Sequence, residues 1–217
     1  MTDFLADARD FLPILINGLW VTVAITLCAL LLSVILGLVW ALLGTSRFVL
    51  LRGVSGVVIN TVRGIPILVQ LFYIYFVLPQ LGITLNAFLA GVAGLGLAYS
   101  VYQAENFRAG FASVDRSLIE AAESLGMPHG MIVRRLILPL AIRVILPPLG
   151  NTSIMLLKDS SIASTITVAE LTRQGQLLAV STFKNMTVYT LVALLYLAMS
   201  LPLSFLTRRL ERRFAPR

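Results

Sequence analysis

The sequence predicts an all-α membrane protein with about five transmembrane helices, and two observations carry that prediction. First, 58% of the 217 residues are hydrophobic and 12% are charged, whereas an average soluble domain is about 45–50% apolar and about 25% charged. Second, no acidic or basic side chain lies between Asp10 and Arg47, or between Arg63 and Glu105. Uncharged stretches of this length are typical of membrane helices. We therefore expect residues 1–217 to form a single transmembrane domain.

The hydrophobic segments set the order of the predicted spans. These are residues 14–43, 54–78, 87–107, 142–157 and 186–206. The first is longer than the roughly 20 residues that a bilayer requires, so it can tilt or project. The second contains Arg63-Gly64-Ile65-Pro66, and the ends of the fourth are blurred by Pro147-Pro148 and by Lys158-Asp159. The acidic start of the chain is not expected to be a cleavable signal peptide, which needs a basic first region.

The basic residues indicate the orientation of the chain. With the C-terminus in the cytoplasm, the outside segments hold three basic residues, namely Arg9, Arg173 and Lys184. The inside segments then hold twelve, namely Arg47, Arg52, Arg108, Arg116, Arg134, Arg135, Arg143 and the five arginines after residue 207. Since cytoplasmic segments carry an excess of Lys and Arg, we predict N-outside, C-inside. The basic residues form no common binding face, so nucleic acid is not an expected partner despite the net charge of +7.

The loop around residues 115–139 is the most informative polar segment. Ser117 and Glu120 have the spacing of a capping box, which predicts the start of a short helix. Gly126 suits the left-handed residue that ends a helix, and Pro128 prevents its continuation. A second short helix fits residues 129–136. The small side chains of Ala121, Ala122 and Gly126 would let a partner approach one side, although an ordinary helical hairpin between spans fits these residues equally well.

The same loop resembles a family motif. Glu120-Ala121-Ala122, then three residues and Gly126, then nine residues and Leu136-Ile137-Leu138-Pro139 are similar to the EAA loop of ATP-binding-cassette importer permeases, with Leu136 in place of the usual Ile. In that family the loop sits in a groove of the ATPase subunit, and its movement is coupled to the pore. The resemblance therefore implies that coupling to an ATPase uses Glu120, Ala121, Ala122, Gly126, Leu138 and Pro139.

Other segments resemble the polar amino acid branch of this family. Arg63-Gly-Ile-Pro-Ile-Leu-Val-Gln70 is similar to its Arg-Gly-Thr-Pro-Leu-Leu-Val-Gln element, with Ile65 replacing Thr. Residues 146–151, 157–161 and 168–176 match as well, the last two most like glutamine permeases. The resemblance implies the type I importer permease fold and an ATP-driven importer in the bacterial cytoplasmic (inner) membrane. The implied substrate is a polar amino acid such as glutamine or glutamate.

The resemblance also implies the partners. They are separate ATP-binding subunits, a second permease subunit in a homodimer or heterodimer, a periplasmic or extracellular substrate-binding protein, and membrane lipid. The chain has no Gly-x-x-x-x-Gly-Lys-Ser/Thr loop to bind phosphates, so we expect no cofactor here, with ATP and Mg on the partner subunit. We expect no enzyme activity, since His129 is the only histidine and Cys28 the only cysteine.

Five ionisable side chains fall within or beside the predicted spans: Arg63, Glu105, Lys158, Asp159 and Glu170. Each costs about 2.5–3.5 kcal/mol to insert, and such groups usually face a bundle interior or a cavity. For Arg63, Glu105 and Lys158 we favour ion pairs between helices over contact with substrate.

Asp159 is the sharpest candidate for the substrate pathway. Thr152, Met155 and Leu156 precede it by seven, four and three residues, so the four share one helix face. A carboxylate suits the α-ammonium group of an amino acid, and Thr152 would then meet a neutral side chain. Gln70 could line the same pathway or bond a neighbouring helix. A structural ion pair is the alternative for Asp159.

A secondary amino acid transporter driven by an ion gradient would explain the buried charges equally well. Such folds usually contain paired halves with broken helices, and five spans do not divide in that way. A membrane enzyme or scaffold subunit is a third class, weakened by the lack of histidine and metal-ligand clusters.

Overall fold

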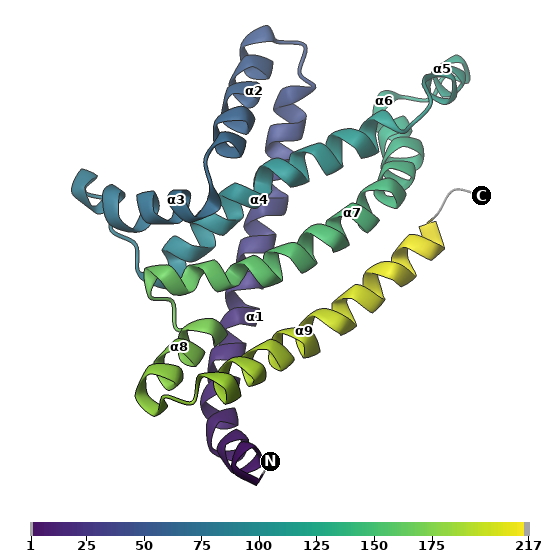
Figure 1. Cartoon of the computed structure of the whole chain (residues 1–217). Coiled ribbons are helices and arrows are strands. Elements are labelled where there is room, and N and C mark those ends of the chain that lie inside the picture. Colours follow the sequence, from purple (N-terminus) through teal and green to yellow (C-terminus); the bar gives the residue numbers. More distant parts are fainter. Residues whose placement is uncertain (1, 215–217) are drawn as a thin grey trace.

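The computed structural model describes residues 2–214, and those residues form helices and short turns with no strand among them. The longest helix is α1 (Thr2–Gly44), which runs from the N-terminal end of the molecule to the opposite end (Figure 1). It begins well before residue 14, where the first predicted span starts. The acidic N-terminal segment is therefore part of the helix.

The second predicted span is broken rather than continuous. α2 (Val49–Gly64) folds back along α1, and the chain then bends by 102° before α3 (Ile67–Phe72), the π-helical turn η1 (Tyr73–Val77) and the short helix η2 (Leu78–Leu81). Ile65 at the bend has an extended backbone, as expected for a residue that precedes proline.

Three long helices lie beside one another across α1: α4 (Ala87–Ala112), α7 (Leu138–Asp159) and α9 (Asn185–Phe214). α4 begins at the predicted residue because the Asn86 side chain accepts a hydrogen bond from the Leu89 amide at 2.8 Å, which caps the helix. Shorter elements join them, namely α5 (Arg116–Ser124), α6 (His129–Ile132), the π-helical turn η3 (Val133–Ile137), η4 (Ser160–Ile166) and α8 (Leu171–Thr182).

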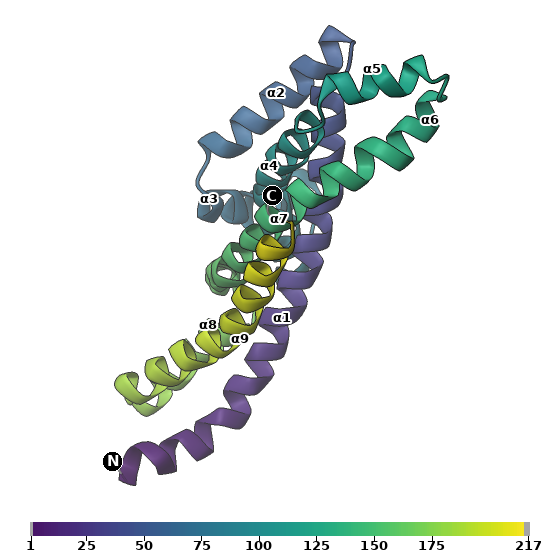
Figure 2. The same ribbon diagram turned by 90° about the vertical axis from the view of Figure 1, so that its right-hand side faces the viewer.

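The two ends of the molecule carry different elements. α5 and α6 project at the end away from the N-terminus, on the side toward which α9 carries the C-terminus (Figure 2). α8 and the start of α9 lie toward the N-terminus, where Lys184 forms an ion pair with Asp7. The start of α1 and the end of α9 thus lie toward opposite ends of the bundle.

Within residues 2–214, three helices are long and apolar enough to cross a membrane: α1, α4 and α9. The bent pair of α2 and the segment 67–81 would make a fourth span. The predicted fourth span corresponds to α7, which does not reach the same standard of length and composition. By length and composition the described residues thus hold three or four candidate spans, against the about five that the sequence predicts, and the difference is α7.

The core forms where α1 and α4 approach closely at glycines. A Cβ atom at Gly37 would lie 2.5 Å from the Gln103 Cβ and 2.9 Å from the Ser100 carbonyl oxygen. A Cβ at Gly96 would lie 2.7 Å from a Leu32 methyl group. Small residues allow membrane helices to pack backbone against backbone. These glycines therefore fix the distance between the two helices that the rest of the bundle packs against.

This packing predicts a destabilising effect of Gly37→Ala. The added methyl group overlaps Gln103 and the Ser100 carbonyl, so we expect the free energy of unfolding to fall by about 1–3 kcal/mol. Gly53→Ala is the matched control, because a Cβ at Gly53 has no neighbour within 4 Å and alanine favours a helix by up to about 1 kcal/mol. Thermal unfolding in detergent measures both variants. Equal melting temperatures for G37A and G53A would contradict the close packing.

Candidate functional site

The first candidate site is the α5–α6 corner, which comprises residues 115–132. α5 starts at Arg116 because the Asp115 side chain accepts a hydrogen bond from the Ser117 amide at 3.0 Å. The predicted capping box is therefore wrong. The Ser117 amide donates its hydrogen bond to the Asp115 carboxylate and not to the Glu120 carboxylate, and Glu120 lies further along the helix. An aspartate before the helix competes successfully for the same amide.

The end of α5 is as predicted at Gly126. Its φ of 75° is left-handed, and its amide donates to the Glu123 carbonyl at 2.9 Å. The Met127 amide donates to the Ala122 carbonyl at 3.1 Å. These two bonds form a Schellman motif, which stops the helix and fixes the direction of the chain. Pro128 then precedes α6, whose Met131 amide bonds back to the Pro128 carbonyl.

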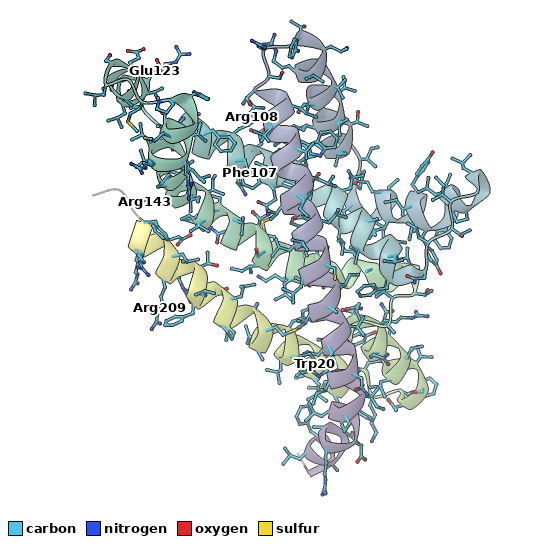
Figure 3. All side chains as sticks on the ribbon, turned by 180° about the vertical axis from the view of Figure 1, so that it is seen from behind. Trp20, Phe107, Arg108, Glu123, Arg143 and Arg209 are labelled. Atoms are coloured by element: carbon cyan, nitrogen blue, oxygen red, sulfur yellow. The ribbon has the colours of Figure 1, made fainter. Side chains whose placement is uncertain are left out.

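The outer surface of the corner carries both polar and apolar side chains. Glu120 and Ala121 are exposed, and Leu125 is 82% exposed, which is unusual for so large an apolar side chain unless it meets a partner or lipid. Figure 3 shows Glu123 at the tip, away from the helical bundle. Of the three small residues that the sequence places toward a partner, Ala122 is buried within the corner, whereas Ala121 and Gly126 are exposed.

One unbroken helical run joins the corner to the middle of the bundle. α6, η3 and α7 follow one another without a gap from His129 to Asp159. The separate short helix predicted over residues 129–136 is therefore only the start of this run. In the π-helical turn the Leu138 amide donates to the Val133 carbonyl, five residues back, which accommodates Pro139 and its missing donor. Leu138 and Pro139 are exposed at this turn.

The second candidate site lies at the far end of α7, where Asp159 meets α4. Its Oδ2 atom accepts a hydrogen bond from the buried Tyr99 hydroxyl at 2.7 Å. Thr152 is buried, and its hydroxyl accepts a hydrogen bond from Asn106 of α4 at 3.1 Å. The predicted stripe does not share one environment, because Leu156 is fully buried in the core and Met155 is 52% exposed. Of the four residues, Asp159 and Thr152 face α4.

Gln70 closes the break between α2 and α3. Its Nε2 atom donates to the Val62 carbonyl at 2.9 Å and to the Ile65 carbonyl at 2.8 Å. In a continuous helix the amide of residue 66 would bond to Val62, but Pro66 has no amide hydrogen. The side chain of Gln70 replaces that donor and supports the bend, which agrees with the bond to a neighbouring helix that the sequence left open as an alternative to a pathway position.

The charges near α2 and α4 form a half-exposed cluster. Arg63 and Arg108 lie 3.4 and 3.5 Å from the Glu105 carboxylate, which agrees with the ion pair expected for Arg63 and Glu105. They border a cavity of about 300 Å³ that also reaches Arg52 and Asn60. Lys158 is exposed and has no ion pair among residues 2–214. The ion pair expected for it is therefore absent from the described part of the chain.

Glu170 is a fully buried carboxylate that joins three helices. It caps α8 by accepting hydrogen bonds from the Thr172 and Arg173 amides at 2.9 and 2.7 Å. It also accepts bonds from the hydroxyls of Thr22 in α1 and Tyr196 in α9, at 3.4 and 2.8 Å.

Comparison with known proteins shows which family this chain belongs to. Residues 33–216 match the family described as the binding-protein-dependent transport system inner membrane component. The chain belongs to this family. It is 38% identical over 204 residues to the glutamine transport system permease protein of Escherichia coli strain K12, with 93% of each chain covered. It is 37% identical over 206 residues to the L-cystine transport system permease protein of Bacillus subtilis, covering 94% of this chain and 88% of that protein.

A solved structure agrees with the fold of this permease. The crystal structure of an amino acid ABC transporter with histidines contains a chain that is 41% identical, with a TM-score of 0.89 over 98% of this chain and 99% of that one. The all-α fold and the family expected from the EAA motif are thereby confirmed. The sequence did not reveal the role of Tyr99 beside Asp159, although a tyrosine hydroxyl within an apolar span needs a polar partner.

Glu170 accepts hydrogen bonds from residues of α1, α8 and α9. We therefore expect its substitution to reduce stability more than any other single polar substitution in this permease. Glu170→Ala leaves three donors without their acceptor, namely the Thr172 and Arg173 amides and the Tyr196 hydroxyl, while Thr22 keeps the Gly18 carbonyl. We therefore expect the free energy of unfolding to fall by about 3 kcal/mol or more. Glu170→Gln keeps one acceptor oxygen, so its free energy of unfolding should lie between those of the unchanged protein and E170A. Glu123→Ala, at an exposed glutamate, should change it by less than about 0.5 kcal/mol. If denaturation in detergent gives E170A and E123A the same free energy of unfolding, the hydrogen bonds of Glu170 do not hold the three helices together.

Proposed function

We propose that this permease forms the translocation pathway of an ATP-driven amino acid importer in the bacterial cytoplasmic membrane. The observation that carries the proposal is the exposed α5–α6 corner at the end of a helical run that reaches Asp159. Relatives named as glutamine and L-cystine permeases support an amino acid as the substrate. We expect a polar one such as glutamine or glutamate.

The proposed complex has four kinds of subunit. Two ATP-binding subunits hold ATP and Mg and contact the α5–α6 corner. A second permease subunit, either a copy of this chain or a paralogue, completes the pathway. A substrate-binding protein docks on the outside. The N-outside, C-inside orientation places the corner in the cytoplasm, and the twelve basic residues on that side support it.

Alternating access follows from the stiffness of this arrangement. When ATP draws the two ATPase subunits together, the corners move with them, and the run from His129 to Asp159 carries the displacement to the contact between α7 and α4. ATP shifts the equilibrium toward the outward-facing state only if it binds that state more tightly. Hydrolysis then returns the inward-facing state.

Asp159 is the proposed contact for the α-ammonium group of the substrate. Its Oδ2 atom is occupied by Tyr99, which fixes the carboxylate and leaves Oδ1 available among the described residues. A charge-assisted hydrogen bond to an ammonium group is about twice as strong as a neutral one. Thr152 lies two turns away on the same helix. Its hydroxyl already accepts from Asn106 and donates to the Pro148 carbonyl, but it brings no charge to this part of α7, which favours a neutral side chain on the substrate.

Uptake into proteoliposomes that hold the complete transporter tests the function. We expect accumulation of glutamine or another polar amino acid with ATP and the binding protein, and none with a proton gradient alone. Leu125→Asp places a charge on the exposed corner and should reduce ATP-driven uptake at least about tenfold by weakening ATPase contact. Val180→Asp changes a similarly exposed side chain of α8 and should leave uptake intact. Uptake driven by a proton gradient without ATP would rule out the proposal.

Asp159→Asn tests the substrate contact. It removes the charge but keeps an oxygen for Tyr99, so we expect normal assembly and loss of uptake. Tyr99→Phe removes the other partner of the same hydrogen bond. It should reduce uptake only a few-fold, because the carboxylate remains charged. If D159N transports normally, or if Y99F and D159N lose uptake equally, the carboxylate serves the packing of α4 against α7 instead.

A further inference from the structure

The end of α9 carries a groove that the transport mechanism does not use. Phe205, Arg208, Arg209 and Arg212 line a hollow of about 250 Å³. Their spacing of three, four and seven residues places them on one face of the helix. The Arg209 guanidinium lies 4.4 Å from the centre of the Phe205 ring, so the aromatic ring supports the charge from one side.

The opposite face of the same helix end is turned toward α7. Thr207 is buried, and its side chain leaves no room for a Cβ atom at Gly150. Glu211, the only acidic residue of α9, accepts a hydrogen bond from Asn151 of α7 at 3.1 Å. The arginine face therefore looks away from the bundle, as the label for Arg209 shows in Figure 3. Among residues 2–214, Arg208, Arg209 and Arg212 form no ion pair.

An apolar stripe leads into this groove along the span. Leu194, Leu197 and Leu201 lie on the same face as Phe205, and each is about half exposed. Only 22% of the most apolar window of α9 is buried, against 61% for α4. The face of α9 is thus apolar along the membrane and strongly basic where the helix leaves it.

We propose that this face binds an anionic phospholipid, with the headgroup phosphate between Arg208 and Arg212 and an acyl chain along the leucines. Guanidinium groups bind phosphate oxygens through paired hydrogen bonds. Basic pockets beside membrane helices bind anionic headgroups. A zwitterionic headgroup brings its own cation and gains less from three arginines. The proposal does not depend on the transported substrate.

Native mass spectrometry of the full-length permease in its purified complex tests this site with dioleoyl phosphatidylglycerol. We expect one lipid per permease to bind more tightly than phosphatidylcholine with the same acyl chains. Arg208→Gln combined with Arg212→Gln should weaken phosphatidylglycerol binding by roughly 30-fold, since each basic residue near the surface contributes about fivefold. Glycerol phosphate without acyl chains should not compete at the same concentration.

A charge-matched variant serves as the control. Arg143→Gln with Arg213→Gln also removes two exposed positive charges, but neither residue lines the groove. It should keep the affinity for phosphatidylglycerol within about threefold. Equal weakening in both double variants would show attraction to the overall charge and would overturn the site. Loss of the ATP-binding subunits from R208Q/R212Q, with lipid binding unchanged, would assign the face to a protein contact and also overturn it.

Discussion

A polar group within the apolar interior of this permease has to find its partner in the protein itself, and the helices are joined where those partners meet. Hydrocarbon offers no hydrogen bonds, so each unsatisfied group costs several kcal/mol. Glu170 meets this requirement by accepting bonds from α1, α8 and α9. The Nε2 atom of Gln70 meets it by supplying the donor that Pro66 lacks, whereas the Oε1 atom of the same side chain is buried with no partner among the described residues. Both side chains therefore determine the geometry of the backbone around them.

The same requirement makes the route from the α5–α6 corner to Asp159 stiff. A helical run satisfies most of its own backbone, and the π-helical turn absorbs Pro139 without a break. Pro147 and Pro148 inside α7 each remove one helical hydrogen bond, but the helix continues through them. The close contacts of α1 with α4 at Gly37 and Gly96 hold the other side of that route in place. In the proposed function, a displacement at the corner would therefore move the α7 surface relative to α4.

Local sequence patterns were reliable where a single residue decides the conformation. Gly126 is left-handed and ends α5, because this conformation depends only on neighbours along the chain. Patterns that involve a choice between two residues were less reliable. Asp115 and not Ser117 caps α5, since both offer a suitable side chain and the motif does not rank them. Helical periodicity likewise placed Leu156 beside Asp159, yet periodicity cannot tell which side of a face meets the core.

By itself the sequence determined the all-α membrane fold, the family and the position of the EAA motif, because apolar runs, charge spacing and a motif of fixed spacing are properties of the chain alone. Only the tertiary structure decided that the second span is bent by 102°, that Tyr99 holds Asp159, and that Glu170 joins three helices. Partners from distant parts of the chain satisfy these groups. Which donor reaches which acceptor depends on how the helices pack, and no local pattern records that arrangement.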